Sequence, residues 1–474
     1  MLNENNFETV AGLEIHAELN TKSKVFCSCE NSFGGAENSK LCPMCMGLPG
    51  ALPTLNKKVV ELAVKAGLAL NCKVQNYSTF DRKNYCYPDL PKAYQITQFY
   101  NPVCRNGFVA VKNKKIGIKQ IHIEEDAGKL IHLKNENITL ADYNRCSVPL
   151  IEIVSDPDLN NGEEARLFAE EIALILKYLN VCNCQMEKGN LRCDVNISVK
   201  PKNSKTLGNR TEIKNLNSFR AVQHAVEAES KRQIELILKG EKIKRETLHF
   251  DDLKGTLTVM RNKEDTEDYR YFPEPDLPSL VLGDEYIQNI SKSLPELPLA
   301  KIKRYTAELS VPLADAKLIV SHPETAELFE KAAENTADIK ALVSLINVEL
   351  PRLLKNTSIT ESKITPTHLR DICNMLSENK ISGLSAKNLL KMCFENGKNA
   401  KYNAETAGMI LKNNTDEIYE VIKRVIKSNG TAAEQYKTGS KKVLGFLIGE
   451  TVKSLGSSAN PKLIKELLIK ELEK

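Results

Sequence analysis

Residues 7–53 read FETVAGLEIHAELNTKSKVFCSCENSFGGAENSKLCPMCMGLPGALP, and the two halves of this stretch follow different patterns. The first half alternates apolar and polar residues, which predicts a strand. Glu14, His16 and Glu18 would share one face of that strand, spaced about 7 Å apart at period two. These side chains suit a metal site, although the same alternation is also typical of a strand face that meets solvent.

Four cysteines characterise the second half. Cys27 and Cys29 form a C-x-C pair, and Cys42 and Cys45 form a C-x-x-C pair after twelve intervening residues. Four thiols at this spacing suit one tetrahedral zinc ion, because each pair can chelate from a tight turn. With thiols at all four positions, the site would be closed and structural. The alternative is two turns that carry reduced cysteines without a metal.

Length and composition indicate a globular protein of two or three domains. The chain has 474 residues, of which 42% are hydrophobic and 27% charged. Its start lacks the pattern of a signal peptide, and no apolar run approaches the about 18 residues of a membrane span. We therefore expect a cytoplasmic protein with reduced cysteines and no membrane partner. The net charge of +5 neither demands nor excludes nucleic acid.

Two further predicted strands carry carboxylates. In residues 115–129, KIGIKQIHIEEDAGK, His122 and Glu124 would share a face, with Glu125 following at the strand end. Glu152 lies within the apolar run LIEIV at residues 150–154. A carboxylate is costly to bury unless it is paired or bound to a metal, so Glu152 indicates a functional site. The alternative is an edge strand from which Glu152 points to water.

Basic side chains accompany these carboxylates. Residues 80–98, FDRKNYCYPDLPKAYQITQ, contain Lys83 and Lys92, and the two prolines predict a loop without regular structure. Residues 190–199 alternate apolar and polar, which places Arg192 on a strand face that either meets solvent or floors a polar cleft.

The C-terminal part differs in pattern. Prolines cluster in residues 273–298, which indicates a domain boundary. From about residue 299 the periodicity is helical. Residues 401–474 contain 13 lysines and arginines against 9 aspartates and glutamates, so most of the net positive charge lies in this small tail.

The carboxylates and His16 together suit Mg²⁺ better than Zn²⁺, because Mg²⁺ prefers oxygen ligands and keeps several waters. A Mg²⁺ ion held by carboxylates points to phosphoryl chemistry. The chain has no G-x-x-x-x-G-K-[ST] loop and no kinase-type glycine-rich loop. A nucleotide site must therefore be of another type, and we expect Lys83, Lys92 and Arg192 at the phosphates.

Seven motifs, in order along the chain, resemble one family. They are GLEIHAEL, FDRKNYCYPDLPKAYQITQ, HIEEDAGK, SVPLIEIVSDPD, LRCDVNIS, EIKNLNSFR and DYRYFPEPDLP. They resemble the B subunit of the tRNA-dependent amidotransferase, which converts Glu-tRNA(Gln) to Gln-tRNA(Gln) and often Asp-tRNA(Asn) to Asn-tRNA(Asn). The resemblance covers essentially the full length, and the cysteine loop is similar to that of the members that carry zinc.

The resemblance implies an α+β protein of three parts. A mixed-sheet catalytic cradle, similar in fold to glutamine synthetase, would span residues 1–295, with the zinc loop at 27–45. A helical domain would follow at 296–405, and a helical tail that binds tRNA would span 406–474.

The resemblance also implies a reaction and partners. The B subunit would use ATP to phosphorylate the side-chain carboxylate on the misacylated tRNA, and ammonia from the A subunit, an amidase, would then displace the phosphate. A small C subunit would complete the heterotrimer. Family residues that match Glu14, His16, Glu124, Glu125 and Glu152 lie around the Mg²⁺ ion, and either Glu124 or Glu125 would be a direct ligand.

The rival interpretation is a non-enzymatic zinc-containing protein that binds RNA through its basic tail. In such a protein the acidic residues would be dispensable. A buried Glu152 next to His16 would argue against it.

Overall fold

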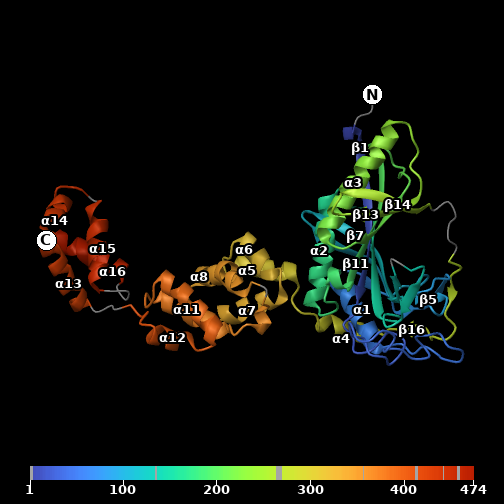
Figure 1. Cartoon of the computed structure of the whole chain (residues 1–474), viewed down its shortest axis with the longest axis horizontal. Helices are drawn as coiled ribbons and strands as arrows, with labels where there is room; N and C mark the ends of the chain where they lie inside the picture. The colour runs from blue at the N-terminus through green and yellow to red at the C-terminus, as the bar shows by residue number, and fades with distance from the viewer. Residues whose placement is uncertain are drawn as a thin grey trace. The chain divides into compact units, whose positions relative to one another are not determined.

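The computed structural model describes residues 4–133, 136–262, 269–355, 357–411, 415–440, 442–455 and 460–473. The chain forms two units, Met1–Leu297 and Pro298–Lys474, each of which is described by itself (Figure 1). The division follows Leu297, two residues beyond the expected end of the first domain. Of the motif DYRYFPEPDLP, Asp268 lies outside the described residues.

A nine-stranded mixed sheet forms the centre of the first unit. Its order is β14-β13-β12-β11-β1-β10-β7-β6-β2, which places β1 in the middle. All neighbouring strands are antiparallel except the parallel pair β12 and β13. The strands are β1 (Phe7–Glu18), β2 (Lys73–Val74), β6 (Cys104–Val111), β7 (Lys114–Glu125), β10 (Pro149–Ser155), β11 (Leu191–Pro201), β12 (Thr211–Leu216), β13 (Glu246–Asp251) and β14 (Thr256–Asn262).

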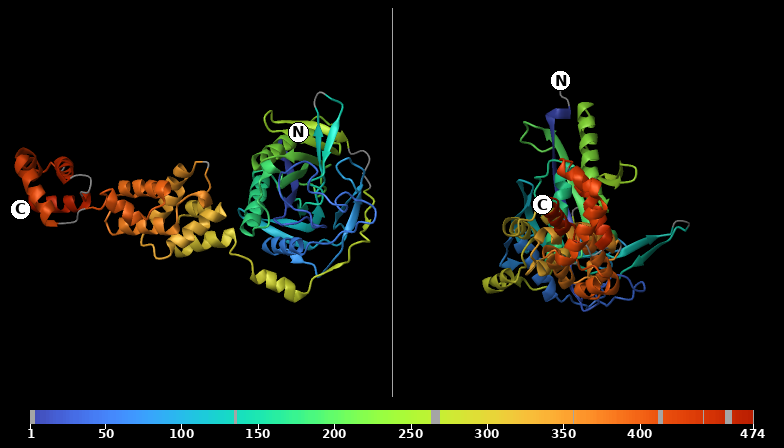
Figure 2. Two further views of the ribbon diagram at one scale, coloured as in Figure 1. Left: turned by 60° about the horizontal axis from the view of Figure 1, so that its bottom comes forward. Right: turned by 90° about the vertical axis from the view of Figure 1, so that its left-hand side faces the viewer.

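Three helices pack against the sheet: α1 (Lys57–Ala69), α2 (Gly162–Tyr178) and α3 (Phe219–Leu238) (Figure 2). Each begins after a polar residue whose side chain accepts a hydrogen bond from the first turn, namely Asn56, Asn161 and Ser218. Apolar residues of β1 such as Ile15 share one hydrophobic core with these helices. The alternation of β1 therefore turns Glu14, His16 and Glu18 to the opposite face, as the sequence predicts.

Residues 80–98 contain two short strands, which corrects the expectation of a loop without regular structure. β4 (Asp81–Asn84) pairs with β5 (Tyr94–Thr97), and β15 (Phe272–Pro273) pairs with β4 from the other side. Pro88 and Pro91 lie in the connection between β4 and β5, where neither interrupts a ladder. Two smaller pairs complete the unit: β3 (Tyr77–Ser78) with β16 (Leu280–Val281), and β8 (Lys129–His132) with β9 (Thr139–Asp142).

All regular elements among the described residues of the second unit are helices, and α4 (Asp284–Lys292) ends the first unit. The fold is thus a mixed α/β part followed by helices, as the sequence predicts. The α-helices are α5 (Pro298–Glu308), α6 (Leu313–Val320), α7 (Pro323–Ala333), α8 (Ile339–Ser344), α9 (Leu350–Leu354), α10 (Pro366–Ser377), α11 (Gly383–Asn396), α12 (Ala400–Thr406), α13 (Thr415–Ser428), α14 (Gly430–Lys437), α15 (Val443–Leu455) and α16 (Pro461–Leu472).

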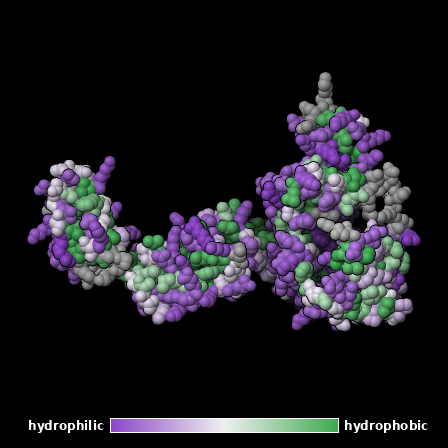
Figure 3. Space-filling model, viewed as in Figure 1, coloured by the Kyte–Doolittle hydropathy of each residue, from purple (hydrophilic) through white to green (hydrophobic). Residues whose placement is uncertain are grey.

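The last four helices share an apolar core of their own. It contains Ile422, Ala433, Leu447, Ile464 and Leu468, with at least one residue from each of α13, α14, α15 and α16. The boundary expected between residues 405 and 406 stays a prediction. Hydrophilic residues cover much of the face seen in Figure 3. None of the described helices combines the length and apolar character that crossing a membrane requires.

Candidate active site and metal centre

A row of four ionisable side chains crosses the middle of the sheet. Glu152 of β10 lies opposite His122 of β7 on one side and opposite His16 of β1 on the other. His16 in turn lies opposite Arg192 of β11. Directly paired residues of antiparallel strands extend from the same face, so all four side chains lie on the face away from the helices. Because β10 is an interior strand, the interpretation of Glu152 as an edge-strand residue is wrong.

His16, Glu124 and Glu152 converge at the centre of this row. The Nε2 atom of His16 lies 3.3 Å from Oε2 of Glu152 and 3.4 Å from Oε1 of Glu124. One ligand atom from each of the three residues lies within 4.8 Å of the others, which is compact enough for one metal ion. Glu124 is almost fully buried, and His16 and Glu152 are half-buried. The structure thus brings together the three residues expected as Mg²⁺ ligands.

The charges in this cluster stabilise one another. Burial disfavours the carboxylate form of Glu152, but His122 and then His16 outweigh it and hold its pKa well below the usual value. Burial likewise disfavours a charged His16, yet Glu152 and Glu124 raise the pKa of His16 to about 8. The same carboxylates raise the pKa of His122 to about 10 against its burial. The two histidines and Glu152 therefore stabilise one another's charged forms.

Glu125 has different partners from Glu124, because neighbouring residues of a strand point to opposite faces. Its carboxylate pairs with Lys92 and accepts hydrogen bonds from the Ile96 amide at 2.9 Å and the Ser147 hydroxyl at 2.6 Å. Glu125 and the Lys92 side chain are both buried. The structure therefore brings Glu124, and not Glu125, to His16, and it engages Lys92 in a buried ion pair.

Comparison with known proteins identifies the family. Residues 9–288 match the GatB/GatE catalytic domain, and residues 327–472 match the GatB domain. The B subunit of the aspartyl/glutamyl-tRNA(Asn/Gln) amidotransferase of Thermoanaerobacter pseudethanolicus is 49% identical over 474 residues, which are 99% of this chain and 100% of that protein. This chain belongs to the amidotransferase B-subunit family.

Further relatives of the same name agree with this assignment. The B-subunit proteins of Caldicellulosiruptor bescii and Clostridium tetani are 48% and 46% identical, each over 99% of both chains. The match of the catalytic domain over residues 9–288 does not favour the rival interpretation of a non-enzymatic zinc-containing RNA-binding protein.

Two further basic residues were expected at the phosphates, Arg192 of the central row and Lys83. Arg192 is bound by Asp126, with 2.8 Å between Nη2 and Oδ2, and Arg145 contacts the same Asp126 oxygen at 3.4 Å. The ammonium of Lys83 lies 5.6 Å and 4.8 Å from the ring centres of Tyr85 and Tyr269. Arg192 thus extends from the same strand row as His16, whereas Lys83 lies in an aromatic group.

A second carboxylate group contains Glu14. Its side chain joins Asp194 of β11 and Glu212 of β12, with one oxygen from each within 4.8 Å of the others. Lys214 lies 3.2 Å from Asp194 and 3.0 Å from Glu212. Burial, and then the negative charge of Glu152, raise the pKa of Glu14. The structure thus gives Glu14 carboxylate partners other than Glu124 and Glu152.

A cavity of about 250 Å³ adjoins Glu14 on the same side of the sheet. Val10, Val154 and Leu207 line it next to polar residues such as Asn196, and two basic residues, Lys119 and Arg210, also line it. A cavity that combines apolar side chains with cations and carboxylates suits a planar base attached to a phosphate chain. The cavity lies next to the second carboxylate group, because Glu14 belongs to both.

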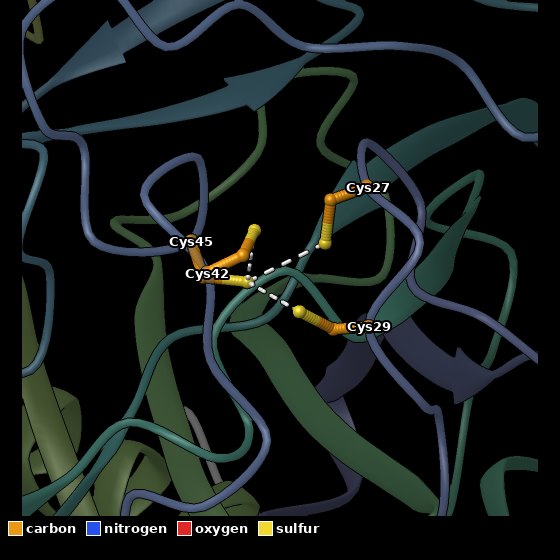
Figure 4. Close-up of side chains that lie close together, drawn as sticks. All are labelled: Cys27, Cys29, Cys42 and Cys45. Atoms are coloured by element: carbon orange, nitrogen blue, oxygen red, sulfur yellow. Dashed lines mark hydrogen bonds between the residues drawn. The ribbon is translucent and has the colours of Figure 1, made fainter.

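The four predicted cysteines form one cluster (Figure 4). The Cys45 sulfur lies 3.4 Å from that of Cys27, 3.6 Å from that of Cys42 and 3.7 Å from that of Cys29. Four sulfurs around a tetrahedral zinc ion are about 3.8 Å apart, since each Zn–S bond is about 2.3 Å. A hydrogen bond with Cys27 lowers the pKa of Cys45 to about 4, which favours the thiolate that a metal ligand requires. The cluster therefore fits a metal.

The cysteine loop lies against the Lys92–Glu125 pair. Gly47 follows the second cysteine pair with a φ of +66°, and a Cβ atom there would lie 2.5 Å from Cγ of Lys92. A side chain at this position is excluded both by the backbone and by Lys92. The loop therefore packs against Lys92, whose ammonium pairs with Glu125.

Sequence reasoning missed three members of the site: His122, Asp194 and Glu212. His122 is predicted to share the face of Glu124, but nothing in β7 alone shows that it lies opposite Glu152. On β11, Arg192 and Asp194 lie two residues apart and share one face. On β12, Glu212 and Lys214 do the same. That alternation of charges on two strands is the signal that could have identified the second carboxylate group.

Proposed function

We propose that this protein activates the side-chain carboxylate of misacylated tRNA by ATP-dependent phosphorylation. The substrate would be Glu-tRNA(Gln), Asp-tRNA(Asn) or both, as the names of the relatives indicate. The observation that carries the proposal is the convergence of His16, Glu124 and Glu152 on interior strands of one sheet face. Such a set has no structural need to be buried, and it suits a divalent cation.

The chemistry requires this kind of site. A carboxylate cannot expel oxide at neutral pH, so phosphorylation must first create a leaving group. Both the attacking carboxylate and the ATP γ-phosphate are negative, and a bound Mg²⁺ ion would offset their repulsion and the charge of the transition state. His16, Glu124 and Glu152 would hold this ion. Ammonia then attacks the acyl phosphate and phosphate leaves.

The second carboxylate group and the cavity support an arrangement of the nucleotide. We propose that the base of ATP occupies the cavity lined by Val154 and Leu207, with Arg210 and Lys119 at the phosphates. The phosphate chain would then run past Glu14 toward His16, because Glu14 lines the cavity and lies two residues from His16 on β1. Glu14, Asp194 and Glu212 would provide a second cation position along this path.

The three residues expected at the phosphates have different roles in this arrangement. Arg192 extends from the row of His16 and stays in the proposal as a cation for the transferred phosphoryl group. Lys83 stays as a cation at the aromatic border of the site. Lys92 does not, because its ammonium is buried and neutralises Glu125, which we propose as a residue that orders the site instead of binding the metal.

Partners and the structural metal complete the proposal. Ammonia would come from the amidase, the A subunit, with the small C subunit as the third member of a cytoplasmic heterotrimer. Cys27, Cys29, Cys42 and Cys45 would hold one structural zinc ion. The basic helices of residues 406–474 would bind the tRNA by contacts to its phosphates.

Glu152→Gln provides the test, because it keeps the shape of the side chain and removes its charge. In the complete complex it should abolish ADP release that depends on Glu-tRNA(Gln) or Asp-tRNA(Asn). Glutamine hydrolysis should change less, since this activity belongs to the amidase. Glu163→Gln, the same change at an exposed position of α2, serves as a matched control. Unchanged ADP release in Glu152→Gln would refute the assignment of the site.

A further inference from the structure

His122 is a buried histidine that the proposed metal site does not use as a ligand. Its Nε2 atom lies 3.0 Å from Oε2 of Glu152 and 3.7 Å from Oε2 of Glu124. His16 contacts Glu124 through the other oxygen, Oε1, at 3.4 Å. The Glu124 carboxylate therefore lies between the two histidines, with one oxygen toward each.

The hydrogen on His122 can be placed from its surroundings. Its Nδ1 atom is buried and has no hydrogen-bond partner among the described residues. In a neutral ring, a hydrogen on Nδ1 would be an unsatisfied buried donor, whereas a hydrogen on Nε2 meets the two carboxylates. In the charged ring, both nitrogens carry hydrogen. In either state Nε2 is a donor, and it therefore offers no lone pair to a metal ion.

His16 differs from His122 in exposure. The side chain of His16 is 20% exposed and that of His122 is 9% exposed. An ion that keeps several waters needs the more open position. The two histidines that contact the same carboxylates are thus suited to different tasks, one to binding the ion and the other to holding its ligands.

We propose that His122 is the positioning residue of the metal site, an inference that rests on the proposed function. Its Nε2 atom pairs with Glu152 at 3.0 Å and lies 3.7 Å from Glu124, and these contacts fix the direction of the remaining carboxylate lone pairs toward His16. Glutamate side chains have several rotatable bonds, so free carboxylates would lose conformational entropy on binding an ion. A donor behind the ligands removes part of that cost, and loss of such partners typically lowers metal affinity by about 10–100-fold.

The test uses Mn²⁺ as a paramagnetic probe of the intact complex. His122→Leu and His122→Asn both remove the donor from the position of Nε2, and the second keeps a polar side chain in case the first does not fold. Both should weaken Mn²⁺ binding about tenfold or more. His122→Gln, whose amide nitrogen reaches the position of Nε2, should stay within about threefold of the native protein.

Two further readouts separate positioning from other roles. At saturating Mg²⁺ the asparagine variant should recover most of its kcat, so the change falls on the Mg²⁺ concentration required and not on the chemical step. The zinc content of His122→Asn should match that of His122→Gln. Its thermal unfolding, measured without added Mg²⁺ or Mn²⁺, should match as well. Native Mn²⁺ affinity in His122→Asn, or a loss of kcat that Mg²⁺ does not restore, would overturn the proposal.

Glu152→Gln is the control that distinguishes this inference from the proposed function. It should abolish the signal of the Mn²⁺ ion bound by His16, Glu124 and Glu152. If a second Mn²⁺ ion binds near Glu14, this loss shows which of the two signals belongs to the first site. If Glu152→Gln retains the ion, the metal-site assignment fails. If Glu152→Gln loses the ion and the His122 variants bind it natively, the failure concerns His122 alone.

Discussion

His16 of β1 and Glu152 of β10 lie directly opposite each other, with 3.3 Å between Nε2 and Oε2. The two residues are far apart in sequence, yet the antiparallel register puts both side chains on one face of the sheet. Ligands of one Mg²⁺ ion bind at about 2.1 Å, so they can be only a few ångströms apart. The His16–Glu152 distance meets this requirement, and it makes the site dependent on the pairing of these two strands.

Glu124 and Glu125 offer a matched pair for separating metal binding from stability. Glu124→Gln should weaken Mn²⁺ binding and abolish tRNA-dependent ADP release. Glu125→Gln should instead lower folding stability, by about 3–5 kcal/mol, because it leaves the Lys92 ammonium buried without its partner. Mn²⁺ titration and denaturant unfolding of both variants check this, and the opposite pattern would exchange the two assignments.

The cavity near Glu14 predicts residues that act on ATP affinity. Arg210→Ala should raise the KM for ATP about tenfold with a smaller change in kcat, since a phosphate contact outside the reacting atoms contributes mainly to binding. Lys205→Ala removes the same charge from the same loop at an exposed position outside the cavity lining, and should leave KM unchanged. Equal KM values in Arg210→Ala and the native protein would place the nucleotide elsewhere.

The cysteine cluster predicts one zinc ion per chain. Elemental analysis of protein purified without chelator should show it. Cys42→Ser should lose the ion and lower the unfolding temperature, whereas Cys86→Ser, an exposed cysteine outside the cluster, should change neither. Native protein without zinc would contradict the prediction.

The basic tail predicts salt-dependent binding of tRNA. Removal of residues 406–474 should weaken tRNA binding about tenfold or more at low salt, and the difference should shrink as salt increases, because phosphate contacts release counterions. The truncated protein should still assemble with its partners, since the sheet unit has a core of its own. Filter-binding titrations over a range of salt concentrations measure this. Equal affinities at low salt would show that the tail is not the binding surface.

The histidine of the metal site predicts a pH dependence of ion binding. The pKa of His16 in the metal-free protein is raised to about 8, so below pH 8 an ion must displace a proton from its ligand nitrogen. Mn²⁺ affinity should therefore rise about tenfold per pH unit up to pH 8 and level off above it. His16→Asn should bind Mn²⁺ weakly and lose this slope. A native affinity that stays constant between pH 6 and 8 would exclude His16 as the ligand.

The sequence predicts the parts of this site that depend on one strand at a time. The alternation in β1 places Glu14, His16 and Glu18 on one face, and the apolar neighbours of Glu152 indicate burial. Contacts between strands could not be predicted in this way, because the register between two distant strands leaves no pattern in the sequence of either one. Two features of the site follow from such contacts. Glu14 lies next to Asp194 and Glu212, and Glu125 forms an ion pair with Lys92. The short strands β4 and β5 also depend on pairing, which overrides the preference of a proline-rich segment for a loop.

The charged row across β7, β10, β1 and β11 also constrains how the chain folds. A shift of β10 by one residue against β1 would turn Glu152 to the helix side, into the layer that contains Ile15. An unpaired carboxylate there would cost several kcal/mol, as would an apolar side chain lost from that layer. Misregistered sheets are thus disfavoured before any ligand is present. Glu152→Leu would remove this penalty, so we expect that variant to be more prone to strand slippage and aggregation during refolding, a liability separate from its loss of activity.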